Sequence, residues 1–175
     1  MRARVTGTVY FLLAIASVLF VLATLNWLPT ALQKDTLRRY GSIEEVRAKL
    51  NMRNLPVPSY FPQSVAWPPA QVLAQAKPYP AVLMVFNRAG AREPALVVSQ
   101  AASDSFSGGA FITLAEVRQR VPYQLKERAA VLEVGVCDNG EPCSRLAWTE
   151  GDFKTTLVMK SPPFELIKIA ESMLH

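Results

Sequence analysis

Histidine is the scarcest chemically useful residue in this sequence, because the single histidine is His175. A serine or cysteine nucleophile normally depends on a nearby histidine as its base. A structural zinc site uses four ligands, and two cysteines with one histidine do not supply them. Phosphate-binding loops, dinucleotide-binding fingerprints and haem-attachment motifs are also missing. We therefore expect no catalytic residues, no metal site and no cofactor, and we predict that the chain is not an enzyme.

The excess of positive charge is too small to indicate nucleic-acid binding. The chain carries 19 basic and 14 acidic residues, a net charge of +5. A nucleic-acid interface typically shows a basic run or face with interleaved aromatic residues, and no such run occurs. We expect no nucleic-acid partner.

Charged residues are absent from 5–33, and within this segment 8–25 is apolar except for two threonines and one serine. A membrane-spanning helix needs about 20 mostly apolar residues. A cleaved signal peptide is the alternative, but its apolar core is usually only about 7–15 residues long. The pattern predicts a transmembrane helix over 8–28, preceded by a cytoplasmic N-terminus (1–7) and followed by a juxtamembrane stalk (29–41).

The predicted helix has a stripe of mostly small side chains at a spacing of about 3.5 residues. Small residues let membrane helices approach each other closely. The stripe is therefore a candidate helix-packing interface for other membrane protein subunits, although small residues also occur in such helices by chance. Its members are Gly7, Tyr10, Ala14, Ser17, Val21 and Thr24.

The two cysteines, Cys137 and Cys143, flank the turn-forming residues DNGEP. Residues rich in β-branched side chains precede this turn and an alternating pattern follows it, so we predict a β-hairpin closed by a disulfide. Two unpaired cysteines are the alternative. Disulfides persist in oxidising compartments, so 42–175 is predicted to be an extracytoplasmic domain. The expected location is the bacterial cytoplasmic membrane, single-pass, with the N-terminus inside.

Hydrophobic periodicity predicts an α+β fold. Strands are expected over 81–87, 94–101, 129–136, 144–150 and 153–160, and helices over 43–52, over 112–121 and after the SPP sequence at 161–163. Ser42 and Glu45 fit a capping box at the first of these helices. The predicted fold class is a small, mostly antiparallel sheet of about five strands with two or three helices packed on it, following a single N-terminal transmembrane helix.

Seven of the 26 residues in 55–80 are proline, a content that forbids a long helix or a central strand. The same segment carries Tyr60, Phe61 and Trp67. A solvated linker rarely contains this much aromatic surface, so we expect an extended segment packed on the core. The alternative is surface recognition of a partner by these three aromatic residues.

The C-terminal sequence WTEGDFKTTLVMKSPPFELIKIAESM, together with YFPQSVAWPP, resembles an uncharacterised family of bacterial membrane-anchored extracytoplasmic domains found in anti-sigma-like and lipoprotein-carrier-like proteins. The resemblance covers about 60 residues and implies a small α+β domain outside the membrane. It implies no catalytic residues.

These features predict a non-enzymatic accessory or structural subunit of a larger bacterial membrane protein complex, such as a respiratory or photosynthetic one. Its partners would be the membrane lipid bilayer and other membrane protein subunits. The alternative is a stand-alone, membrane-tethered binding or sensing module whose unknown ligand is a lipid or a peptide.

Overall fold

The structure is a computed structural model that describes residues 37–52, 55–104, 106 and 111–174, together with Ile15, Ser17 and Val18. The chain divides into two compact units, Met1–Leu37 and Arg38–His175. In the first unit, Ile15, Ser17 and Val18 are helical. The described residues of the second unit form an antiparallel sheet and two helices.

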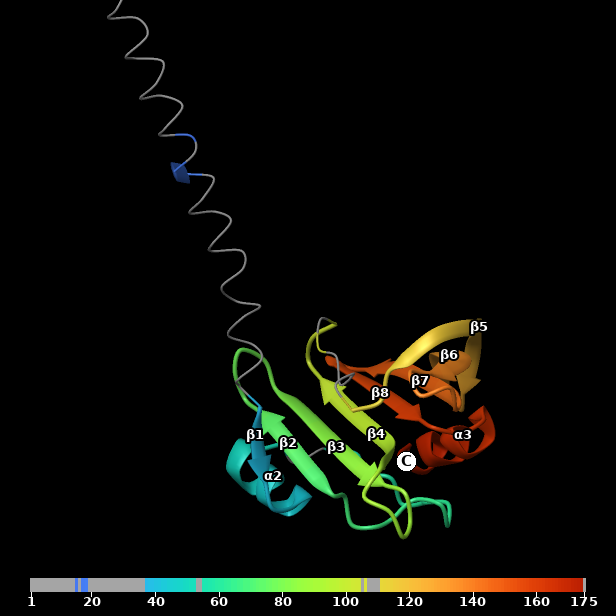
Figure 1. Ribbon diagram of the computed structural model, residues 1–175. Coiled ribbons are helices and arrows are strands. Elements are labelled where there is room, and N and C mark those ends of the chain that lie inside the picture. The colour runs from blue at the N-terminus through green and yellow to red at the C-terminus, as the bar shows by residue number, and fades with distance from the viewer. Residues whose placement is uncertain are drawn as a thin grey trace, which may run out of the picture. The chain divides into compact units, whose positions relative to one another are not determined.

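The second unit is built on an antiparallel sheet of eight strands in the order β1-β2-β3-β4-β8-β7-β6-β5 (Figure 1). The strands are β1 (Arg38–Tyr40), β2 (Gln71–Gln75), β3 (Ala81–Asn87), β4 (Pro94–Ala101), β5 (Leu114–Leu125), β6 (Arg128–Cys137), β7 (Pro142–Glu150) and β8 (Phe153–Met159).

Two meanders make up this sheet. Within the first meander, β1 to β4, and within the second, β5 to β8, strands that follow each other along the chain pair with each other. Between the meanders the chain crosses to the far edge, so that β8 returns beside β4. The pairing of β4 with β8, from Leu96 opposite Met159 to Ala101 opposite Lys154, joins the two halves into one sheet.

One face of the sheet is covered by two helices, α2 (Ile43–Leu50) and α3 (Pro163–Ser172). Figure 1 shows α2 beside β1 and β2, and α3 towards the other end of the sheet. Side chains that alternate along the strands point into this core, because successive residues of a strand face opposite sides. The largest fully buried members are Met84, Phe86, Leu96, Leu125, Leu146, Leu157, Leu166 and Ile169.

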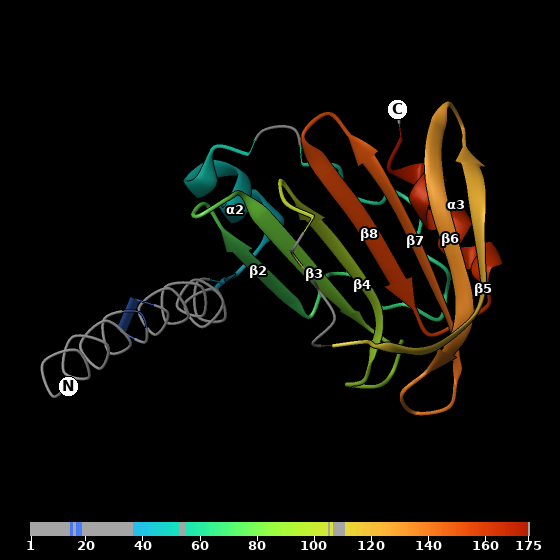
Figure 2. The ribbon, with the colours of Figure 1, turned by 90° about the horizontal axis from the view of Figure 1, so that it is seen from above.

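A smaller apolar cluster lies on the opposite face. Its buried members are Leu83, Val85, Val97, Ile112, Cys137 and Cys143. In this view of the sheet, Figure 2 shows the segment that leads into β5 crossing near one end of the strands. Phe106 and Phe111 pack on the cluster, and the described residues cover only part of this face.

Local signals near α2 act in part as the sequence predicted. The Ser42 hydroxyl accepts a hydrogen bond from the Glu45 N–H at 3.2 Å, and the Glu45 carboxylate accepts one from the Gly41 N–H at 2.6 Å. The Ser42 bond satisfies a backbone donor of the first helical turn, as predicted. The Glu45 carboxylate reaches the N–H of Gly41, one residue before the N-cap, rather than that of Ser42, so only the serine half of the predicted capping box is confirmed.

The predicted fold class is wrong in its strand count and its helices. The sheet has eight strands rather than five, and the described residues contain two short helices in this unit. Residues 114–121 of the expected helix over 112–121 belong to β5, and 112–113 precede that strand. The spacing of Leu114, Val117 and Val121 along this exposed edge strand resembles a helical stripe, which misled the prediction. Residues Arg38–Tyr40, which we placed in the stalk, form β1 at the other edge.

The predicted transmembrane helix is also corrected. Within the described part of the chain, no helix has both the length and the apolar character needed to cross a membrane. Of the segment 8–28, only Ile15, Ser17 and Val18 belong to the described residues, and the rest of the prediction lies outside them. The single-pass location in the bacterial cytoplasmic membrane, which depended on that helix, is therefore not supported by this structure.

Cys137 and Cys143 form a disulfide with a Cα–Cα distance of 5.2 Å. The two residues are not directly opposed, because Cys143 pairs with Gly135 in the register of β6 and β7. Cys137 lies two residues beyond Gly135 and points to the same face. The disulfide therefore joins two side chains on the same face of the hairpin whose positions differ by two residues in the pairing register.

Gly135 allows β5 to approach β6 unusually closely. A Cβ atom at this position would lie 2.9 Å from the carbonyl carbon of Glu116 and still closer to its oxygen. The pairing of β5 with β6 shifts register near Glu116 and again near Val117. Such bulges bend and twist a strand, so the curvature of this edge depends on a residue without a side chain.

Replacing both cysteines, in the variant Cys137→Ala/Cys143→Ala, is expected to lower the free energy of unfolding by about 2 kcal/mol, because the disulfide closes a short loop. Urea unfolding of the wild type and the variant measures this difference. Reductant should shift the wild type to the same extent and leave the variant unchanged. Equal unfolding midpoints in all four samples would contradict the prediction.

Replacing Gly135 with alanine is expected to destabilise the fold by roughly 2–3 kcal/mol, because the new methyl group collides with the backbone of β5. Gly140→Ala is the control. A Cβ there meets nothing within 4 Å, although its φ of +82° makes alanine cost about 1 kcal/mol. Urea unfolding of both variants compares the two effects, and a loss at Gly135 no larger than at Gly140 would refute the close approach.

Candidate functional site

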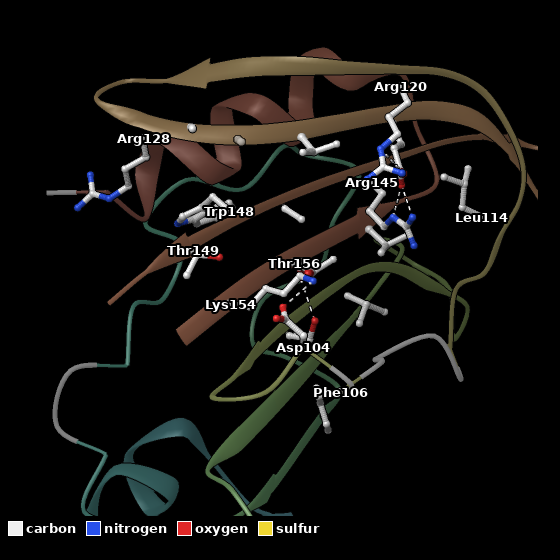
Figure 3. A pocket seen from close by; sticks show the side chains of 18 of the residues that line it. Asp104, Phe106, Leu114, Arg120, Arg128, Arg145, Trp148, Thr149, Lys154 and Thr156 are labelled. Atoms are coloured by element: carbon white, nitrogen blue, oxygen red, sulfur yellow. Dashed lines mark hydrogen bonds and ion pairs between the residues drawn. The ribbon is translucent and has the colours of Figure 1, made fainter. Parts of the chain in front are cut away.

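The face of the sheet opposite the helices contains a cavity of about 1020 Å³. Its floor is formed by β4, β8, β7 and β6, and β5 contributes Arg120 and Pro122 to its wall. In Figure 3 the β5–β6 hairpin arches over the side chains of the neighbouring strands. The cavity is thus a concave part of the sheet that the helices leave open.

Pairing register places the lining side chains in rows across the strands. One row runs from Val97 through Val158, Arg145 and Glu133 to Arg120. The next row contains Ser99, Thr156, Ala147, Val131 and Pro122. The first row is rich in charge, whereas the second row consists of small or short side chains that leave space above the sheet.

Glu133 is the most buried charged residue of the cavity, and its side chain is only 6% exposed. Arg145, directly opposite it on β7, forms a short ion pair and hydrogen bond with its carboxylate. Arg120 on β5 forms a second ion pair with the same carboxylate at 3.5 Å. We call these three residues the Arg–Glu–Arg cluster. Figure 3 shows Arg120 and Arg145 close together, with dashed lines marking the interactions.

A second charged pair lies on the other side of the cavity. The Lys154 ammonium group contacts an Asp104 carboxylate oxygen at 3.1 Å (Figure 3). Lys154 pairs with Thr149, whereas Arg145 pairs with Val158, so the two basic side chains are four residues apart along the strands. At about 3.3 Å per residue this separation is roughly 13 Å, which is the length of about four residues of an extended peptide.

The disulfide lies on the same face of the sheet as the Arg–Glu–Arg cluster. Cys143 precedes Arg145 by two residues on β7, and Cys137 follows Glu133 by four residues on β6. The disulfide therefore clips the hairpin that carries two of the three charged side chains. Cys143 is fully buried, and its disulfide with Cys137 restrains this end of the cavity.

Two of the three predicted recognition residues lie in one aromatic cluster, and the third lies beside α3. Phe61 contacts Trp67 and Phe86, with ring-centroid distances of 5.1 and 5.0 Å, and Trp67 contacts Phe86 at 6.1 Å. Trp67 keeps 56% of its surface exposed. The Tyr60 hydroxyl donates to Glu165 of α3 at 2.8 Å. The segment is packed on the core as its aromatic content predicted, and surface recognition by these residues stays a prediction.

The predicted helix-packing stripe lies outside the described residues except for Ser17. Its remaining members are Gly7, Tyr10, Ala14, Val21 and Thr24. Among the described residues, no group of three or more histidine, cysteine, aspartate or glutamate side chains could hold a metal ion.

The cavity residues were not singled out by sequence reasoning. Glu133 occurs in the sequence AAVLEVGV, where a single acid among apolar residues of a strand is an available signal. A buried charge requires a partner, but the sequence does not show which basic residue lies opposite. Only the strand register brings Arg145 and Arg120 to Glu133.

Neither a family model, nor a curated protein, nor a solved structure matches this chain. The geometry of the cavity is therefore the basis on which a function can be assigned.

The hydrogen bond from Tyr60 holds the pKa of the Glu165 carboxyl below its usual value, with Lys168 adding to the effect. Tyr60→Phe is expected to raise this pKa, because the donor is lost. Since a lowered pKa stabilises the fold above the unfolded-state pKa, and this contribution disappears as pH falls through the folded-state value, the destabilisation should be larger at neutral than at acidic pH.

An NMR titration of the side-chain carboxyl groups measures this change. Glu45 is an internal control, because the pKa of its carboxyl is lowered chiefly by the hydrogen bond from Lys49. A Glu165 pKa that is the same in the wild type and in Tyr60→Phe would rule out the tyrosine as its cause.

Proposed function

We propose that this chain is a non-enzymatic binding protein that holds a peptide segment of a partner protein on the open face of its sheet. The observation that carries the proposal is the cavity of about 1020 Å³ on the side of the sheet that the helices do not cover. Binding sites are typically concave surfaces of roughly 300–1,000 Å³ that combine apolar area with a few placed polar groups.

The chemistry of the lining favours a peptide over a lipid. The hydroxyl groups of Thr149 and Thr156 and the partly exposed charged groups of Arg145 and Lys154 surround the apolar floor. An acyl chain would remove water from these groups without replacing the hydrogen bonds that they make to it, which is costly even for the two charges that already have ion-pair partners. A peptide offers carbonyl and N–H groups together with side chains of either character.

A random nonapeptide library displayed on phage tests the proposal with the full chain of 175 residues as bait. We expect enriched sequences, and we expect synthetic copies to lose at least about tenfold in affinity for Ala147→Phe, because a phenyl ring would occupy the cavity floor. Ala91→Phe, on an exposed turn outside the cavity, should retain wild-type affinity. Thermal unfolding would verify that both variants are folded.

Failure to enrich any peptide, or equal binding by the wild type and Ala147→Phe, would refute peptide binding in the cavity.

A second candidate function is an accessory subunit of a larger protein complex, which the sequence analysis expected in the narrower form of a bacterial membrane protein complex. The observation that favours it is the edge strand β5, which pairs with β6 on one side and is exposed over most of its length. Its Val117 and Val121 are 46% and 40% exposed. An edge strand of this kind can accept a strand from a partner. This second function would be favoured if the phage selection enriched no peptide that binds in the cavity.

A further inference from the structure

The Arg–Glu–Arg cluster has more positive than negative charge. Arg120 and Arg145 both contact the carboxylate of Glu133, so two positive charges share one negative charge and the cluster has a net charge of +1. The other ion pairs at the cavity are matched one to one, Lys154 with Asp104 and Arg128 with Glu150. Glu127, at the turn between β5 and β6, adds a further carboxylate to the lining. The surplus of positive charge is therefore localised at the end of the cavity that holds the Arg–Glu–Arg cluster.

The arginines also have more donors than Glu133 can accept. Each guanidinium group has five N–H donors, whereas a carboxylate has about four acceptor sites. The side chain of Glu133 is 6% exposed, but those of Arg145 and Arg120 are 43% and 70% exposed. The carboxylate thus fixes the two guanidinium groups from the buried side, while much of each group faces the opening.

This arrangement suits an incoming carboxylate. Guanidinium groups bind carboxylates through paired, charge-assisted hydrogen bonds, which are stronger than neutral ones. Because Glu133 already holds both arginines in place, less side-chain freedom is lost when the ligand binds. Next to the cluster, the row of Ala147, Val131 and Thr156 offers space without net charge.

We infer that the cavity selects an acidic peptide, in which one aspartate or glutamate side chain binds between Arg120 and Arg145 and the uncharged residues beside it lie over the small side chains of β6, β7 and β8. This inference rests on the proposed function and adds the class of peptide. Uncharged neighbours are expected because the cavity residues next to the cluster, Ala147, Val131 and Thr156, carry no charge.

The sequences enriched from the phage library are the first test. We expect an aspartate or glutamate at one fixed position in the enriched peptides. Peptides that bind the cavity, and lose affinity for Ala147→Phe, but have no preferred acidic position would overturn this inference while leaving the proposed function standing.

Fluorescence anisotropy with one enriched peptide and its copy carrying Asn or Gln in place of the acid gives the second test. Arg145→Gln and Arg120→Gln should each weaken binding of the acidic peptide about tenfold, as expected for one charge-assisted interaction. The same variants should change the affinity of the neutral copy by less than about twofold. Arg118→Gln is the matched control, because Arg118 lies on the same strand, contacts Glu116 and does not line the cavity.

Glu133→Gln separates ligand binding from a purely structural role. Glutamine keeps an amide oxygen that can still accept hydrogen bonds from the arginines and hold them in place, but it removes their shared counter-charge. Affinity for the acidic peptide should therefore rise by about threefold or more, and that of the neutral copy should not. Weaker binding of the acidic peptide by a folded Glu133→Gln protein, or equal losses for both peptides in the arginine variants, would overturn the inference.

Discussion

The pairing of β4 with β8 is the constraint on which the rest of the structure depends. Residues more than 50 positions apart in the chain lie opposite each other along this seam, from Leu96 and Met159 to Ala101 and Lys154. Each meander could close its own hairpins through local contacts, but neither would build a two-sided sheet of this width. This pairing places both meanders under one layer of helices. On the other face of the sheet, it aligns the side chains of β4 with those of β8, β7 and β6 that line the cavity.

Strand geometry divides this sheet into a stabilising face and a binding face. Along β7, Leu146 and Trp148 are buried in the core, whereas Arg145 and Ala147 line the cavity. Successive side chains of a strand point to opposite faces, so the same nine residues of β7 serve both layers. The bulges of β5 and the close approach at Gly135 then bend the edge towards the binding face.

The Arg–Glu–Arg cluster is tolerated because it lies at the boundary between these layers. A buried ion pair usually gains little net stability, since desolvation opposes the Coulombic attraction. Here the carboxylate of Glu133 is buried, but Arg120 and Arg145 remain in contact with solvent, so much of the hydration of the guanidinium groups is kept. The disulfide holds the neighbouring end of the hairpin, which keeps the carboxylate and Arg145 in register.

The sequence alone determined the elements whose residues have one buried face. The periodicity located β3, β4, β6, β7 and β8 and the two helices of the folded unit within a few residues. It missed β1, which has three residues, β2, which lies between prolines, and β5, whose exposed edge lacks a clear alternation. The predicted five-strand fold with a transmembrane helix was wrong for these reasons and because the described residues contain no spanning helix. The cavity was decided by tertiary structure alone, because only the register between strands brings one carboxylate and two distant arginines together, and register depends on packing across the whole sheet.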